Sequence, residues 1–315
     1  MGMTQATVEG SVGGYSHEAF LYSGMAEFVA GTTSFIRRAV DAGDPVLVIV
    51  SAPKIETLRR ELGAAARRVE FADMAQVGNP ARIISAWQAF VQAHAGAAQL
   101  WGIGEPIYPE RSPAELAECQ LHEALLNVAF DAATPFTLLC PYNLEALAGD
   151  VIDEMHRTHP FVVRGADRQA CGTFQVVGPG GPFGRQLPPA PADAARLSFE
   201  PGGLSRLRSF VTWQARLAKL DPDKTASLVL AVNEIATNSL RHGGGRGELR
   251  AWTDDRSLVC EVSDQGHITE PLVGRLLPTL DSGLGAGLWL ANQLCDLVQI
   301  FSSPSGTAVR VYQDR

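Results

Sequence analysis

The chain has 315 residues, of which 46% are hydrophobic, with 34 acidic against 26 basic side chains. This composition can bury ordinary cores and excludes a largely disordered protein, and the length suggests about two domains. The formal net charge of −8 argues against a protein that coats nucleic acid. The whole excess lies in residues 1–195, which hold 13 Lys and Arg against 21 Asp and Glu, whereas residues 196–315 hold 13 of each. We therefore expect the two parts to meet different partners.

Targeting and redox signals are absent from the sequence. The first 14 residues contain no basic residue and no apolar core, so no signal peptide is expected. The best apolar run, Val46–Val50, is far shorter than the roughly 20 residues of a membrane helix. The five cysteines are odd in number and contain no CxxC pair, which indicates reduced thiols. We expect a cytoplasmic protein that contacts neither membrane nor nucleic acid directly.

Pro and Gly dominate only one stretch, residues 178–194, which we interpret as a linker between domains at 14–177 and 195–315. In the first domain, short continuous apolar runs alternate with helical patterns, and Ser112-Pro113-Ala114-Glu115 is typical of a helix start. This alternation predicts an α/β domain with a parallel sheet flanked by helices. The expected strands are Pro45–Val50, Gln99–Ile103 and Phe136–Cys140, and the expected helices include Ile55–Leu62 and Asn79–His94.

The second domain has a different order of elements, with clustered helices and mostly antiparallel strands, which favours an α+β layer. The expected strands are Arg196–Phe199, Glu248–Trp252, Leu258–Ser263, Val298–Ser302 and Thr307–Tyr312, and the expected helices are Leu204–Leu220, Pro222–His242 and Leu284–Cys295.

A polar stripe on the predicted helix Pro222–His242 is the first candidate for chemistry. Helical spacing puts Glu234, Asn238 and Arg241 on one stripe beside an apolar face. A carboxylate and an amide four residues apart can reach one hard cation or one water. Taken alone, the pattern is better explained by a solvated polar stripe.

Two further segments favour a site. Asp264 and Gly266 follow a predicted strand, where an acid can accept from an exocyclic amine and glycine lets a ligand lie against the backbone. Gly283, Gly285 and Gly287 then lie at the start of a predicted helix. Glycines at a helix start leave the backbone N–H groups accessible, so that they can bind phosphates.

In this order, the three segments resemble the GHKL (Bergerat-fold) ATPases, over most of residues 196–315. The resemblance implies a Bergerat-fold sandwich that binds ATP and Mg²⁺. It also implies roles for single residues, namely Asn238 as the Mg²⁺ ligand, Glu234 as the general base, Asp264 with Gly266 at the adenine amine, and Gly283, Gly285 and Gly287 at the phosphates.

Two positions depart from the family pattern. His267 stands where the second glycine of DxGxG is usual, and Ala286 stands where anti-sigma serine kinases often carry a basic residue. Both are expected to weaken ATP binding or turnover. The sequence contains no GxxxxGK[ST] motif, so nucleotide binding would depend on this site alone.

Within the superfamily, the short last domain with ATNSLRHG and GLWLANQLCDLVQI resembles the anti-sigma serine kinases. In the first domain, HEAFLY from His17, GEPIY from Gly104, ECQLHEALLN from Glu118 and Cys140-Pro141-Tyr142 resemble a MEDS sensory domain, whose fold is thought to be RecA-like. MEDS followed by this ATPase is the architecture of the RsbA-type anti-sigma regulatory proteins.

This resemblance implies a regulator of transcription and stress response whose sensory domain, responding to an unidentified small molecule or protein, gates an ATP- and Mg²⁺-dependent serine kinase. Its implied partners are a sigma factor and a STAS-domain anti-sigma antagonist. One alternative is a catalytically weak ATP-binding module that sequesters a sigma factor. An orphan sensor histidine kinase is less favoured, because no histidine lies between His159 and His242. The oligomeric state stays open, with a homodimer as one alternative.

Other clusters are ambiguous. The segment Asp153–His159 could hold a metal, although capping and surface roles are favoured, and core packing is favoured for Cys119 with His122. Aromatic and polar groups near strand ends could line a ligand pocket or could equally pack in the core, namely His17, Trp101, Glu105 and Tyr108.

Overall fold

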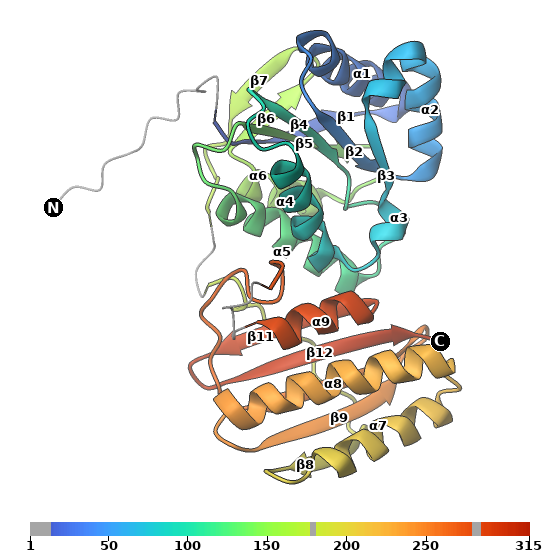
Figure 1. The fold of residues 1–315 in the computed structure, drawn as a ribbon, viewed down its shortest axis with the longest axis vertical. Coiled ribbons are helices and arrows are strands. Elements are labelled where there is room, and N and C mark those ends of the chain that lie inside the picture. The colour runs from blue at the N-terminus through green and yellow to red at the C-terminus, as the bar shows by residue number, and fades with distance from the viewer. Residues whose placement is uncertain (1–13, 177–180, 279–284) are drawn as a thin grey trace, which may run out of the picture. The chain divides into compact units, whose positions relative to one another are not determined.

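The computed structural model describes residues 14–176, 181–278 and 285–315 (Figure 1). Gly178–Gly180 of the predicted linker and Gly283 of the predicted site lie outside the described residues. Contacts divide the chain into two compact units. The first contains Met1–Ala75, Ala89–Pro109 and Phe130–Phe174, and the second contains Gln76–Gln88, Glu110–Ala129 and Gln175–Arg315.

The first unit is built on a seven-stranded sheet in the order β3-β2-β4-β5-β1-β6-β7. All neighbouring strands are parallel except β6 and β7, which the two residues Gly165 and Ala166 join into an antiparallel hairpin. The α/β prediction is confirmed, with one antiparallel edge strand added. The strands are β1 (Ser16–Tyr22), β2 (Val46–Val50), β3 (Glu70–Asp73), β4 (Leu100–Gly104), β5 (Phe136–Asn143), β6 (Phe161–Arg164) and β7 (Asp167–Ala170).

Helices α1 (Gly24–Ala42) and α2 (Ala52–Leu62) bury their apolar stripes in one core with β1 and β2. The close fit of α1 on β1 requires Gly31, because a Cβ there would lie 2.2 Å from the ring of Phe20. The remaining helices that begin in the first 175 residues are α3 (Met74–Val77), α4 (Ile83–Ala93), α5 (Pro113–Ala129) and α6 (Gly149–Thr158), with short 3-10 turns at Gly63–Arg68 and Pro80–Arg82.

The second unit contains a five-stranded antiparallel sheet in the order β11-β12-β10-β9-β8. Helices α7, α8 and α9 lie side by side on one face of this sheet (Figure 1), which confirms the predicted α+β layer. The elements are β8 (Ala195–Phe199), α7 (Leu204–Leu217), α8 (Pro222–His242), β9 (Gly247–Thr253), β10 (Ser257–Asp264), α9 (Ala286–Leu294), β11 (Leu297–Ser303) and β12 (Gly306–Asp314).

Local capping explains where two helices begin. Helix α8 begins after Asp221, whose side chain accepts from the N–H of Asp223 at 2.9 Å, with Pro222 in the first position. Helix α5 begins with a capping box, in which Ser112 and Glu115 bond to each other's backbone N–H groups. The predicted helix start at Ser112 is therefore confirmed.

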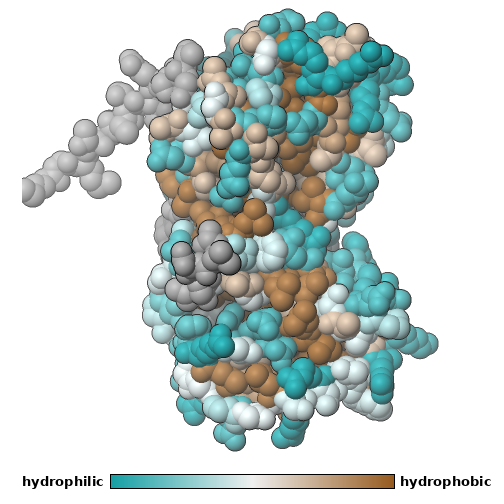
Figure 2. Space-filling view, viewed as in Figure 1, coloured by the Kyte–Doolittle hydropathy of each residue, from teal (hydrophilic) through white to brown (hydrophobic). Residues whose placement is uncertain are grey.

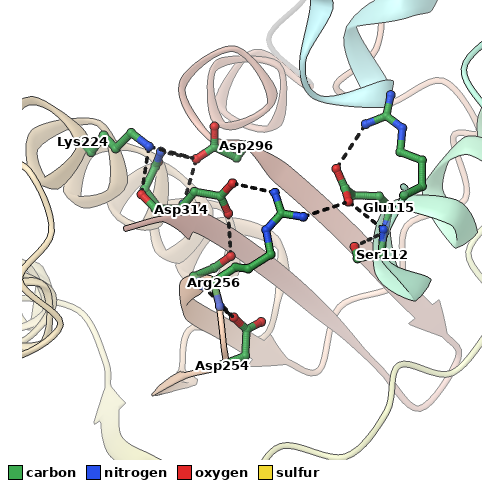
Figure 3. Close-up of polar contacts among 10 residues, drawn as sticks. Ser112, Glu115, Lys224, Asp254, Arg256, Asp296 and Asp314 are labelled. Carbon is green, nitrogen blue, oxygen red and sulfur yellow. Dashed lines mark hydrogen bonds and ion pairs between the residues drawn. The ribbon is translucent and has the colours of Figure 1, made fainter. Parts of the chain in front are cut away.

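A polar network closes the end of β12 within the second unit (Figure 3). Asp314 accepts from the guanidinium of Arg256 at 3.3 Å and from the hydroxyl of Ser257 at 2.7 Å, while its carbonyl accepts from Lys224 at 2.9 Å. The Arg256 guanidinium also lies 3.9 Å from Glu115. These contacts tie the last strand to the start of α8 and to the β9–β10 turn.

Apolar surface is distributed unevenly. On the side of the second unit that carries α7, α8 and α9, hydrophobic residues reach the surface among hydrophilic ones (Figure 2). Trp213 and Leu217, one turn apart on α7, are 57% and 61% exposed.

A membrane-spanning helix must be both long and apolar, and none of the helices in the described residues meets both conditions.

A buried ion pair joins β10 and β12. Arg310 is 4% exposed and Glu261 is 6% exposed, and the guanidinium donates two hydrogen bonds to the carboxylate, at 2.5 and 3.0 Å. Arg310 also donates to the carbonyl of Pro188 at 2.7 Å. The pair thus holds the strand that carries Thr307 against the strand that ends at Asp264.

We predict that Arg310→Leu lowers the free energy of unfolding by about 3–5 kcal/mol, because the buried Glu261 carboxylate loses both hydrogen bonds from Arg310 and keeps only Arg250, at 3.9 Å, as a charge partner. Urea denaturation followed by circular dichroism measures the effect. Arg206→Leu, at an exposed arginine of α7, is the control and should change stability by no more than about 0.5 kcal/mol. Equal losses for the two variants would contradict the assigned role of the pair.

Candidate functional site

Helix α8 presents Glu234 and Asn238 one turn apart, and both are half-buried. The first turn of α9 lies directly against them. A Cβ on Gly287 would be 3.1 Å from Asn238 Nδ2 and 3.3 Å from Glu234 Cβ, with Glu234 Oε2 at 3.5 Å. The structure therefore brings together three of the predicted site residues from two helices. Arg241, the third member of the polar stripe, is exposed.

The start of α9 has the geometry of an anion site. Gly285 is the N-cap residue and has a φ of +98°, a left-handed conformation that favours glycine. Its carbonyl accepts from the N–H of Trp289 at 2.8 Å, which closes the first helical turn. In such a turn the preceding N–H groups lack partners within the helix, and the helix dipole favours a negative charge beside them. The predicted phosphate-binding role of this turn fits its backbone.

Asp264 is the last residue of β10, and its Oδ1 accepts from the N–H of Gly266 at 2.7 Å. Glycines surround this carboxylate because side chains would collide with it. A Cβ on Gly243, just after α8, would lie 2.3 Å from Asp264 Cγ, and a Cβ on Gly266 would lie 2.9 Å from Oδ1. The end of α8 and the turn after β10 therefore hold the Asp264 side chain in a defined position.

A cavity of about 630 Å³ connects these parts. This is a usual size for a small-molecule or cofactor site. Among the predicted residues, Asn238, Asp264, Gly266 and Gly285 line it. Glu234 and Gly287 adjoin Asn238 without being lining residues. Much of the remaining wall is apolar and suits the flat face of a base, including Ile235, Ile268, Leu272, Val273 and Val309.

Sequence reasoning missed Thr307, which also lines the cavity. It is paired in register with Asp264, and its hydroxyl donates to the carbonyl of Gly266 at 2.9 Å and contacts Ser302 Oγ at 2.8 Å. The predicted last strand begins at Thr307, but nothing in its local sequence indicates that this residue lies opposite Asp264. Gly306 is required because a Cβ there would lie 2.6 Å from the carbonyl oxygen of Asp264. Thr307 is far from Asp264 in the sequence, and the pairing of β12 with β10 brings the two residues together.

The first turn of α2, just after β2 in the first unit, carries a lysine, Lys54, that is bound by an acid of the same unit. Lys54 Nζ donates to both carboxylate oxygens of Glu105, at 2.5 and 2.6 Å, and to the hydroxyl of Tyr22 at 2.8 Å. Burial raises the pKa of the Glu105 carboxyl despite this lysine, and burial together with Glu105 raises the pKa of Tyr22. The ion pair therefore occupies the ammonium group of Lys54 within the first unit.

Two protein families match the sequence in succession. Residues 16–160 match the family described as MEDS, the MEthanogen/methylotroph, DcmR Sensory domain, and residues 197–312 match the family described as the Histidine kinase-like ATPase domain. The chain carries a MEDS domain followed by a histidine kinase-like ATPase domain. The second match places the cavity of α8, β10 and α9 in a family of ATP-binding domains.

Other comparisons are distant. No curated protein matches the sequence. Among solved structures, the RsbU and RsbW domains of Rv1364c from Mycobacterium tuberculosis match with 18% identity and a TM-score of 0.31. That match covers 40% of this chain and 34% of the other, so the chain spans about a third of the length of that protein. This likeness assigns no activity.

We predict that Gly287→Val in the ATPase domain lowers ATP affinity by at least ~10-fold, since the new side chain would displace Asn238 or Glu234, and displaced contacts of about 1.4 kcal/mol give that factor. Titration calorimetry with Mg-ATP measures the change. Gly149→Val is the matched control, because Gly149 opens α6 and nothing lies within 4 Å of its added Cβ. Unchanged affinity in Gly287→Val would show that ATP binds away from this contact.

Proposed function

We propose that the protein is an anti-sigma regulatory protein in which the MEDS domain gates an ATP- and Mg²⁺-dependent serine kinase. The observation that carries the proposal is the convergence of Glu234, Asn238 and Gly287 next to a cavity that also exposes Asp264, inside a histidine kinase-like ATPase domain. The proposed domains are 14–177 for sensing and 195–315 for ATP binding, joined by 178–194. Transcription regulation, stress response and a cytoplasmic location belong to the same proposal.

The donor set fits ATP with Mg²⁺. Asn238 and Glu234 each carry a side-chain oxygen, a hard ligand of the kind that Mg²⁺ prefers. Both side chains lie beside the first turn of α9, where the Asn238 atom closest to Gly287 is Nδ2 and Glu234 Oε2 is also near. Asn238 would hold the ion, which when bound neutralises charge on the phosphates. The N–H groups after Gly285 would contact the phosphates, with Gly283 and Gly287 allowing close approach. Asp264, fixed by Gly266, would accept from the adenine amine.

Phosphoryl transfer then needs a base for the incoming hydroxyl. Glu234 lies within one helical turn of the proposed Mg²⁺ ligand and is only half-buried, so a partner's serine can reach it. In this role Glu234 accepts the hydroxyl proton as the γ-phosphoryl group moves to the serine oxygen and ADP leaves. The exposed Trp213 and Leu217 on α7 offer apolar surface for a protein partner such as a sigma factor or a STAS-domain antagonist.

One observation favours a second candidate, a weak ATP-binding module that sequesters a sigma factor without phosphorylating anything. Among the described residues that line the cavity, none is Lys or Arg. Ala286 and His267 stand at the two positions where the related kinases carry a basic residue and a glycine. The phosphates would then depend on the helix N-terminus and the metal alone.

We predict that incubation with Mg-ATP and the STAS-domain proteins of the source organism yields phosphoserine on one of them. Glu234→Ala should lower the rate by about 10²–10⁴-fold, the usual contribution of a general base. Mass spectrometry locates the phosphoserine, and radiolabelled ATP gives the rate. Glu200→Ala, at an exposed glutamate before α7, is the control and should leave the rate unchanged.

The outcomes separate the candidates. ATP binding without transfer to any STAS protein would support the sequestering module instead of the kinase. An acid-labile phosphate on the chain itself would support an orphan histidine kinase.

A further inference from the structure

We propose that the first unit contains a transition-metal site formed by His17, Cys140 and His159, independent of the ATP site. One ligand atom from each residue lies within 4.8 Å of the others. The three side chains are 1%, 1% and 0% exposed. Two imidazoles and a thiolate form a donor set that zinc and other borderline metals prefer over Mg²⁺ or Ca²⁺.

The topology of the sheet brings these distant residues together. Strand β1 lies between β5 and β6. Parallel pairing sets His17 opposite Leu138 and Ala19 opposite Cys140, so His17 and Cys140 lie on the same face. His159 is the C-cap residue of α6, two residues before β6 pairs with β1. Two neighbouring strands and the residue that ends α6 therefore each contribute one donor.

The atoms that face one another are those that bind metals. His17 Nε2 lies 3.4 Å from Cys140 Sγ, and the ring centroids of His17 and His159 are 4.0 Å apart. His159 Nδ1 lies 3.1 Å from the carbonyl oxygen of Met155, which can only accept a hydrogen bond. Nδ1 also lies 3.0 Å from the hydroxyl of Thr158, which can itself donate to the carbonyl of Met155 and then accept from Nδ1. With Nδ1 protonated in this way, Nε2 is the ring nitrogen that would ligate a metal. A backbone carbonyl that fixes the tautomer in this way is the usual outer partner of a metal-binding histidine.

The competing explanation is a packed core with a single thiol–imidazole hydrogen bond. The same unit provides a matched pair for comparison, since His156 Nδ1 also lies 3.4 Å from the sulfur of Cys171. That pair is only half-buried, and no metal-binding group among the described residues includes it. The pair of His156 and Cys171 therefore has the same nitrogen–sulfur contact but lacks a third metal-binding side chain beside it.

The test uses the full chain without an affinity tag, stripped with a chelator and then titrated with Zn²⁺ or Co²⁺. We expect one metal ion per chain, and with Co²⁺ a thiolate charge-transfer band together with the visible absorption of a four-coordinate ion. Cys140→Ser should abolish the band. The same substitution should lower zinc affinity by more than roughly 100-fold, because even outer partners of metal ligands contribute about 10–100-fold.

Two further variants keep the test decisive. His17→Gln retains the thiol and should weaken zinc binding by at least ~10-fold. The double variant with Cys171→Ser and His156→Gln should bind as the wild type does. A stripped wild-type chain that gives no cobalt band, or a band that persists in Cys140→Ser, would overturn the proposal. If Cys140→Ser fails to fold by circular dichroism, the wild-type titration and His17→Gln still decide.

Discussion

The candidate site of the ATPase domain depends on a glycine, Gly287, where any side chain would crowd α8. Gly287 lets the first turn of α9 approach α8 so closely that a single added carbon would lie 3.1 Å from Asn238 Nδ2. This approach places the N–H groups at the start of one helix beside a carboxylate and an amide of the other. Backbone donors and hard oxygen ligands are what a nucleotide triphosphate with its metal requires. The sheet then adds Asp264 and Thr307 to the wall of the cavity.

Glycine serves the site in two physically different ways. At Gly285 a left-handed backbone is needed so that the chain can turn into α9. At Gly243, Gly266 and Gly287 the requirement is space, since added carbons would meet the Asp264 carboxylate or the side chains of α8. The two departures from the related kinases, His267 and Ala286, fall beside these glycines without removing any of them. The geometry that the proposed ATP site needs is therefore kept, while no Lys or Arg is present among the described residues that line the cavity.

Much of this could be predicted from local sequence because the determining interactions are local. The Asp221–Pro222 cap marks the start of α8, and the four-residue spacing of Glu234 and Asn238 puts them on one side of that helix. The predicted strands at Pro45–Val50, Gln99–Ile103 and Phe136–Cys140 correspond to β2, β4 and β5, whereas β6 was missed although it begins with an apolar run. Strand β1 was missed, because SHEAFLY mixes polar and apolar residues and contains no β-branched residue.

What could not be predicted depends on pairing across the sheet. Thr307 joins the site only because β12 pairs with β10 in one register, so that Thr307 lies opposite Asp264. His17, Cys140 and His159 are likewise far apart in sequence, and local spacing instead grouped His159 with His156 and Asp153. Long-range strand order, which no short motif encodes, decides which of these side chains meet.

The central claim is that ATP binds in the cavity formed by α8, the end of β10 and the start of α9. A crystal structure of the full chain with Mg²⁺ and a non-hydrolysable ATP analogue tests it most directly. The account predicts the adenine amine on Asp264, the phosphates at the first turn of α9 and the metal on Asn238. A nucleotide bound at Lys54 in the first unit, or one whose metal contacts neither Asn238 nor Glu234, would contradict it.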